Sequence, residues 1–112
     1  MKKYQLGEFE EIVLLTEGVL YGQAYGVSIK AHIEQKLNRK VSVGAMQSAL
    51  RRMESKGYLS SEFGESTKER GGKRKRYFKI SATGKEALDY NRQTRADLFN
   101  QIPEVAWEFK IC

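Results

Sequence analysis

The chain has 112 residues, and its 20 lysines and arginines outnumber 14 acidic residues to give a net charge of +6. A hydrophobic content of 40% with 30% charged residues predicts one folded domain, because a chain of this length is too short for two cores. No apolar run approaches the roughly 18 residues of a membrane span. The only cysteine, Cys112, excludes an intrachain disulfide, so we expect a reducing cytoplasm.

The positive charge is concentrated in the middle third of the chain. Residues 42–80 hold ten basic and four acidic residues, whereas the segments before and after carry net charges of only +1 and −1. Such a local excess is typical of a surface that binds a polyanion, most simply nucleic acid. A solvated basic surface would have the same composition, so charge alone leaves both interpretations open.

The first predicted helix covers residues 8–20. Phe9, Ile12 and Val13 share one face, and further leucines and valines widen the apolar stripe. A helix that is apolar on more than one side is either central or touches a partner chain. We therefore expect Leu14 to take part in a contact between two copies.

Two further helices are predicted next. The second runs from about Tyr25 to Leu37, because apolar residues recur every four positions and form a narrow buried stripe. The third begins after the N-cap Ser42 and ends near Lys56, where Gly57 stops it. Its inner face is apolar, and its opposite face is polar: Gln47, Ser48, Arg51, Arg52 and Ser55.

Residues 58–63 and 76–80 show the alternation of strands, separated by a loop that contains glycine. We expect Leu59 and Phe63 to lie on one side of the first strand and Tyr77 to face outward from the second. A two-stranded hairpin is marginal in water, so it must pack on the helices.

A fourth helix is predicted from the N-cap Thr83, with Glu86 completing a capping box, to about Gln101. Its apolar positions are too sparse for a monomeric core, which favours an arm along a second subunit. Residues 103–112 fit a strand or a helix equally well. The residues expected at the contact between copies, besides Leu14, are Leu88, Leu98, Phe99, Ile102 and Trp107.

Three helices followed by a hairpin is the order of a winged helix-turn-helix, whose third helix enters the major groove. We therefore expect a mostly α fold with a small two-stranded β wing. Residues 1–82 would bind DNA and residues 83–112 would dimerise, in one compact unit. Gly44 either lets the backbone approach phosphates or serves packing. The predicted DNA contacts lie on the third helix and in the basic loop: Ser42, Gly44, Gln47, Ser48, Arg51, Arg52, Lys68, Arg70, Lys73 and Arg74.

Catalytic chemistry is not expected. His32 is the only histidine and lacks a cysteine or carboxylate cluster nearby, so no metal site is predicted. No phosphate-binding glycine loop is present either, and we expect no cofactor. Two other functions stay open: a winged-helix module that binds a protein or RNA, and a non-specific architectural DNA binder.

Five segments together resemble the PadR family of bacterial transcriptional regulators: LGEFE (6–10), AYGVSI (24–29), VSVGA (41–45), ALRRMESKGY (49–58) and ERGGKRKRYF (69–78), followed by Thr83-Gly84. The resemblance implies a homodimer that binds an inverted-repeat operator in double-stranded DNA, usually as a repressor. Many members carry tyrosine where this chain has Gln47. Small members can form a cavity for a small-molecule effector between the two copies. Trp107 either lines such a cavity or packs the dimer contact, and we favour packing.

Overall fold

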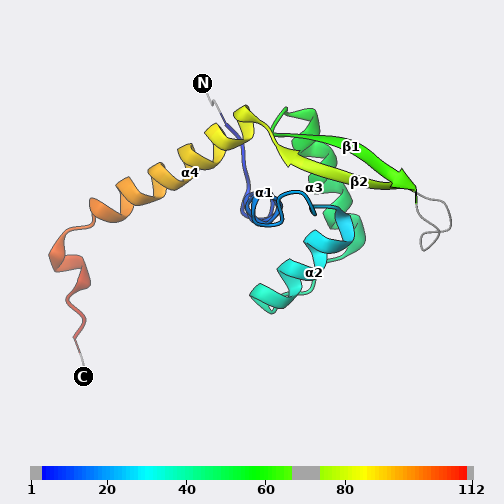
Figure 1. The fold of residues 1–112 in the computed structure, drawn as a ribbon. Helices are drawn as coiled ribbons and strands as arrows, with labels where there is room; N and C mark the ends of the chain where they lie inside the picture. The colour runs from blue at the N-terminus through cyan, green and yellow to red at the C-terminus, as the bar shows by residue number, and fades with distance from the viewer. Residues whose placement is uncertain (1–3, 67–73, 111–112) are drawn as a thin grey trace.

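The computed structural model describes residues 4–66 and 74–110. The body consists of α1 (Glu8–Val19), α2 (Gly26–Leu37) and α3 (Val43–Ser55), and the antiparallel strands β1 (Leu59–Ser66) and β2 (Arg74–Ile80) extend from it. Helix α4 (Ala82–Asn100) leaves the body on the side opposite the hairpin, and the 3-10 helix η2 (Glu104–Trp107) follows it (Figure 1). This order confirms the predicted winged helix-turn-helix with a C-terminal helix.

Helix α1 is the central element of the body. It packs against α2, α3, α4 and β2, so residues on two of its sides are enclosed. Leu14 is 0% exposed, and the prediction that it contacts a second copy is wrong, since its side chain is buried within its own chain. The next residue, Leu15, is 49% exposed and is available at the surface instead.

The turn between α2 and α3 is fixed by local hydrogen bonds. Glu34 of α2 accepts a hydrogen bond from the Val41 amide at 2.9 Å. Ser42 caps α3 as predicted, because its Oγ accepts from the Ala45 amide at 3.0 Å. Gly57 follows the helix with φ of 80°, a left-handed conformation that favours glycine.

The N-cap of helix α4 lies two residues earlier than predicted. The N-cap is Ser81, whose Oγ accepts from the Gly84 amide at 3.0 Å, and Thr83 lies inside the helix. The reason is that the first turn of α4 lies directly against the body. A Cβ on Gly84 would lie 2.0 Å from the carbonyl oxygen of Tyr58. The hydroxyl of Ser81 also donates to the carbonyl of Gly57, which ties the start of α4 to the end of α3.

The hairpin pairs in register from Leu59 opposite Ile80 to Phe63 opposite Arg76. Phe63 is 56% exposed, and the guanidinium groups of Arg74 and Arg76 lie over its ring. The predicted orientation of Tyr77 is wrong. Tyr77 is half-buried, because it packs edge-on against Tyr25 with ring centroids 5.7 Å apart.

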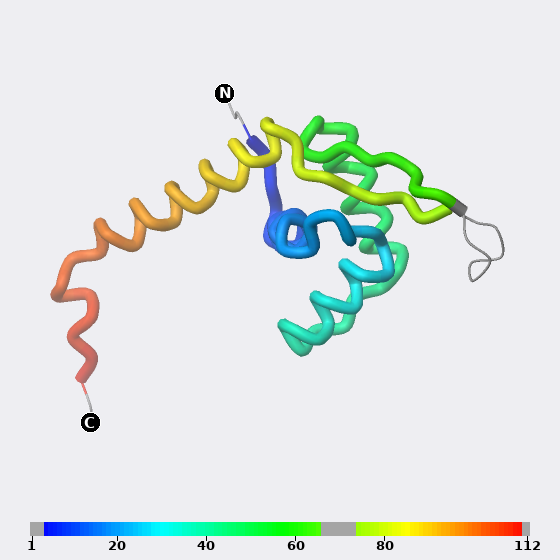
Figure 2. Tube along the Cα trace, viewed as in Figure 1, coloured from blue at the N-terminus to red at the C-terminus, as the bar shows by residue number. Residues whose placement is uncertain are grey.

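Helix α4 forms an arm that contacts the body through side chains up to Arg95. Glu86 accepts from the Tyr4 hydroxyl at 2.9 Å, and Arg95 forms an ion pair with Glu11. The Cα radius of gyration is 17.7 Å, compared with about 13 Å for a compact domain of this length. Figure 2 shows the C-terminal end of the arm and the tail standing clear of the body.

The tail adopts neither of the two conformations that the sequence left open. Residues 104–107 form a single 3-10 turn, and residues 108–110 have no regular structure. Trp107 turns back onto Phe99 of α4, with ring centroids 5.8 Å apart. In the described part of the chain, no helix is both long and apolar enough to cross a membrane.

Candidate nucleic-acid interface

Helix α3 presents a polar face away from the core. Met46, Ala49, Leu50 and Met53 are buried on its inner side. On the outer side Gly44, Gln47 and Arg51 are exposed and Ser48 is half-buried. Ser42 stands exposed at the start of this face, although its hydroxyl oxygen is already used as the helix cap. The polar face therefore offers hydrogen-bonding side chains to a partner outside the chain.

The two neighbouring arginines of α3 have different surroundings. Arg51 is exposed and forms no ion pair with another described residue. Arg52 lies on the flank toward α1, where its Nε donates to Glu10 at 2.8 Å. Glu10 is 6% exposed, and it also receives bonds from Lys56 at 3.4 Å and from the Gly7 amide at 3.2 Å. Arg52 thus forms an ion pair within the chain. This role was not predicted, since Arg52 was expected to contact DNA.

Glu10 stays ionised in this arrangement. Burial alone would raise the pKa of its carboxyl, but the bond from Arg52, the Gly7 amide and the charge of Lys56 together lower the pKa below its usual value. An ionised carboxylate with few waters around it depends on these partners. The group links the start of α1 to the last turns of α3.

The two arginines are expected to respond differently to alanine. Arg51→Ala should leave the melting temperature within about 2 °C of wild type and weaken DNA binding about tenfold or more, because only the external contact is lost. Arg52→Ala should lower the free energy of unfolding by about 1–2 kcal/mol, because Glu10 loses a charged partner while it stays buried. Thermal melts and DNA titrations of both variants test this. Equal melting temperatures would contradict the assignment.

Gly44 has no packing role within the described chain. A Cβ built at this position meets nothing within 4 Å. Since Gly44 lies in the first turn of α3, beside the amides that the helix leaves unpaired, a bare backbone would allow a phosphate to come close. Of the two roles considered for this glycine, the open space favours the approach of DNA.

Gly44→Ala is accordingly expected to separate stability from binding. Alanine should raise the free energy of unfolding by a few tenths of a kcal/mol up to about 1 kcal/mol, since it is the better helix former. It should weaken DNA binding, because the new methyl group stands where the backbone meets the duplex. Denaturant unfolding and a DNA titration measure both effects. A variant that is more stable and binds DNA as well as wild type would exclude close approach at this position.

A groove of about 230 Å³ lies beside the polar face, between the first turns of α2 and α3 and strand β2. Gln47 forms part of its wall, and its Nε2 lies only 3.3 Å from where a Cβ on Gly26 would be. The cations on its walls come from α2 and β2: Lys30, Arg74, Lys75 and Arg76. We call this feature the basic groove. Its charge and its place next to α3 suit phosphate groups that flank a helix in the major groove.

Three of these cations were not predicted to contact DNA, and the fourth, Arg74, was predicted to lie in the loop. Lys75 lies over the ring of Tyr25 at 4.2 Å, and Lys30 belongs to a helix whose position relative to the hairpin depends on the tertiary fold. The run of basic residues could have indicated Lys75 and Arg76. Arg74 is part of β2 rather than the loop and donates to the Gly64 carbonyl at 2.8 Å. The predicted contacts outside the described residues are Lys68, Arg70 and Lys73.

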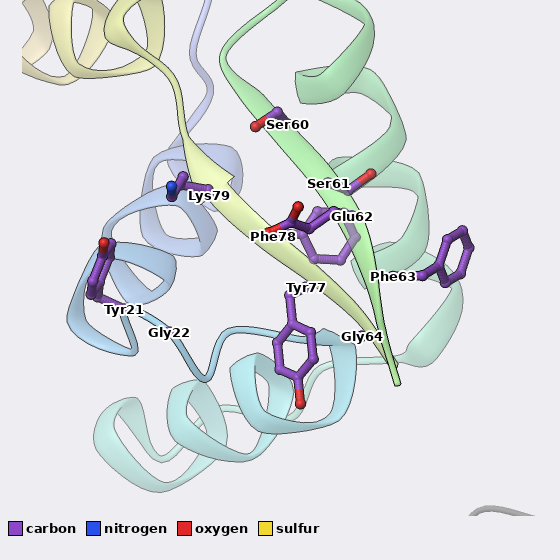
Figure 3. Close-up of a pocket in the computed structure, with 10 residues that line it drawn as sticks. All are labelled: Tyr21, Gly22, Ser60, Ser61, Glu62, Phe63, Gly64, Tyr77, Phe78 and Lys79. Atoms are coloured by element: carbon purple, nitrogen blue, oxygen red, sulfur yellow. The ribbon is translucent and has the colours of Figure 1, made fainter. Parts of the chain in front are cut away.

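A larger hollow, of about 430 Å³, lies along the hairpin next to the loop that follows α1 (Figure 3). Its lining includes one acidic residue, Glu62, and one basic residue, Lys79. Because these charges cancel, the hollow lacks the excess positive potential that a polyanion requires. The basic groove is the better candidate for DNA, although it is smaller.

The residues expected at a contact between copies lie along the arm. Leu98 is 62% exposed, Phe99 64%, Ile102 36% and Trp107 43%, while Leu88 is half-buried. Next to Leu88, a mostly apolar groove of about 440 Å³ separates α4 from Leu15 of α1. This much exposed apolar surface on α4 and the tail that follows it is unusual for a monomer.

Comparisons with known proteins agree with this geometry. Residues 9–90 match the model of the transcriptional regulator PadR-like family, whereas no curated protein matches the chain. Similar structures include a PadR-like transcription factor from Bacteroides fragilis, with 23% identity, a TM-score of 0.70, and coverage of 84% of this chain and 85% of that one. A PadR family transcription regulator from Clostridium difficile R20291 is 28% identical, with a TM-score of 0.59 and coverage of 80% and 91%.

Another similar structure is that of PadR from Bacillus subtilis in complex with operator DNA, with 16% identity and a TM-score of 0.58. The match covers 72% of this chain and 44% of the Bacillus subtilis protein, so that protein has a large part without a counterpart here. Among the described residues no group of acidic, histidine or cysteine side chains could hold a metal ion. With the family match spanning most of the chain and a winged fold that carries a basic groove, the protein belongs to the PadR-like family of DNA-binding transcriptional regulators.

Proposed function

We propose that the protein is a homodimeric repressor that binds an inverted-repeat operator in the cytoplasm of a bacterial cell. In each copy the polar face of α3 reads base edges in the major groove, while the basic groove and the wing contact the adjacent phosphates. Gln47 is suited to adenine and Arg51 to guanine, because their side chains can form paired hydrogen bonds with those bases.

One observation carries this proposal: the exposed polar face of α3 adjoins the basic groove, so base-reading and phosphate-binding groups point to the same side. A protein-binding module would instead expose apolar side chains on α3. The described face exposes Gln47 and Arg51, and its exposed apolar residue Val43 lies at the edge of the groove. Binding of protein or RNA, and non-specific DNA binding, are outcomes that the experiment below distinguishes.

The arm supports homodimerisation. Leu98, Phe99 and Trp107 would be buried against a second copy, and the groove beside Leu15 could receive them. Two identical arms related by a twofold axis would set the two α3 helices apart symmetrically, as an inverted repeat requires. The packing of Trp107 on Phe99 supports a role in the contact rather than in a cavity. The resemblance to the PadR family further suggests that a small-molecule effector binds at this interface.

The proposal is tested by selecting genomic fragments with the purified chain at about 0.15 M salt and sequencing them, since salt suppresses weak electrostatic binding. We expect one enriched inverted repeat with half-sites about one helical turn apart. Uniform recovery would indicate an architectural DNA binder, and recovery of no DNA would favour the protein- or RNA-binding module.

A further inference from the structure

Helix α3 carries a single acidic residue, Glu54, between Ser42 and Gly57. A carboxylate on a helix that enters DNA is unfavourable, because it repels the phosphates. Here both of its oxygens have partners on the hairpin. Oε1 accepts from Nη2 of Arg76 at 2.8 Å, and Oε2 accepts from the hydroxyl of Ser61 at 2.7 Å.

The two hairpin residues are also bonded to each other, since Nε of Arg76 donates to Oγ of Ser61 at 2.8 Å. The three side chains thus form a closed set of hydrogen bonds that joins α3, β1 and β2. Figure 3 shows Ser61 on the side of β1 that faces α3. The guanidinium of Arg76 lies 5.7 Å from the ring centroids of both Phe63 and Phe78, which restricts its movement further.

Elsewhere the hairpin is held by Leu59, which lies in the core, by the backbone amide of Phe78, which donates to the carbonyl of Ala24 at 2.8 Å, and by the packing of Tyr77 on Tyr25. A two-stranded hairpin is marginally stable by itself, so its angle to α3 depends on such contacts with the body. The side chains that line the basic groove come from α2 and α3 in the body and from β2 in the hairpin. Its shape therefore depends on the angle between α3 and the hairpin.

We propose that Glu54 is a positioning residue that fixes the angle between α3 and the β1–β2 hairpin, so that both engage one DNA duplex together. The inference rests on the proposed function. When α3 and the hairpin are held at a fixed angle, one of them binds DNA first. The other then contacts the same duplex at little further entropic cost. Glu54 strengthens DNA binding even though its charge opposes it.

The sign of this effect gives a direct test. Removing a negative charge near phosphates should tighten binding if charge alone matters. Glu54→Gln should instead weaken binding by about fivefold, because the amide cannot hold Arg76 as the carboxylate does. The matched control is Glu62→Gln, which removes the same charge from an exposed residue of β1 and should bind as well as wild type or slightly better. Binding is measured by fluorescence anisotropy with a 30-base-pair duplex taken from the genomic selection and with a mixed-sequence duplex of equal length.

Arg76→Gln completes the experiment as a second background. In the Arg76→Gln background the bond between Arg76 and Glu54 is already absent. Adding Glu54→Gln should therefore weaken DNA binding no further, and should tighten it slightly because a negative charge is removed. Thermal melts of each variant show that the fold persists. Wild-type binding with equal affinities for Glu54→Gln and Glu62→Gln would overturn this inference alone. Failure of the wild type to bind either duplex would overturn the proposed function and this inference with it.

Discussion

Replacing Glu17 with leucine is expected to raise the free energy of unfolding by about 3 kcal/mol at pH 7, and the melting temperature by roughly 10 °C. Glu17 lies on α1 and is 2% exposed, and neither carboxyl oxygen has a hydrogen-bond partner among the described residues. Burial raises the pKa of its carboxyl from 4.5 to about 8. Folding at pH 7 must therefore protonate a group that is ionised in the unfolded chain.

The pH dependence follows from the direction of this shift. Between pH 4.5 and 8 the folded state holds the proton of Glu17 and the unfolded state does not, so this group lowers stability as the pH rises. Below pH 4.5 both states are protonated and the effect vanishes. Glu17→Gln keeps the shape but never ionises. Its advantage over wild type should grow by about 1.4 kcal/mol per pH unit across this range.

Denaturant unfolding of wild type, Glu17→Gln and Glu17→Leu at several pH values, at one protein concentration, measures both effects. The control is Glu108→Gln, a change at an exposed residue of the tail, which should follow wild type at each pH. If the difference between Glu17→Gln and wild type is constant from pH 5 to 8, then Glu17 does not titrate as its burial requires.

Placing asparagine at both Leu98 and Phe99 is expected to convert the proposed dimer into monomers. Fully burying such a side chain stabilises by about 1.5–3 kcal/mol, and each substitution occurs twice in a symmetric dimer. The dimer dissociation constant should therefore rise by at least about 10⁴-fold. Affinity for a DNA with two half-sites should fall as well, because the copies would bind separately.

Light scattering after size-exclusion chromatography measures the oligomeric state. The emission of Trp107, the only tryptophan, should shift to the red as its surroundings become wet. The control places the same two asparagines on the opposite face of α4, as Gln93→Asn with Asp97→Asn, which removes an exposed hydrogen bond and one surface charge but no apolar side chain. A Leu98/Phe99 variant that stays dimeric would show that copies associate through another surface.

Local sequence signals were sufficient for most of the elements. Apolar spacing and caps placed α1, α2 and α3 to within about two residues, because the Ser42 cap and the Gly57 stop act on their own neighbours. The cap of α4 was misassigned to Thr83. Both Ser81 and Thr83 precede a helical pattern, and only the contact of Gly84 with Tyr58 in the folded chain selects the first.

The parts of the site that sequence missed depend on long-range packing. Arg52 reads like Arg51 in the sequence, and only the folded chain brings Glu10, 42 residues away, against it. Lys30 joins the hairpin cations because α2 crosses beside β2, which periodicity does not encode. Leu14 was given to a partner because a wide apolar stripe does not reveal how many elements of its own chain surround a helix.

The central claim is that two copies place their α3 helices in successive major grooves of one operator. A hydroxyl-radical footprint of the selected inverted repeat, combined with the mass of the complex from analytical ultracentrifugation, tests it most directly. We predict two chains per duplex and two protected stretches about one helical turn apart, on the same side of the DNA. A single chain with one protected stretch, or protection along the whole duplex, would contradict the claim.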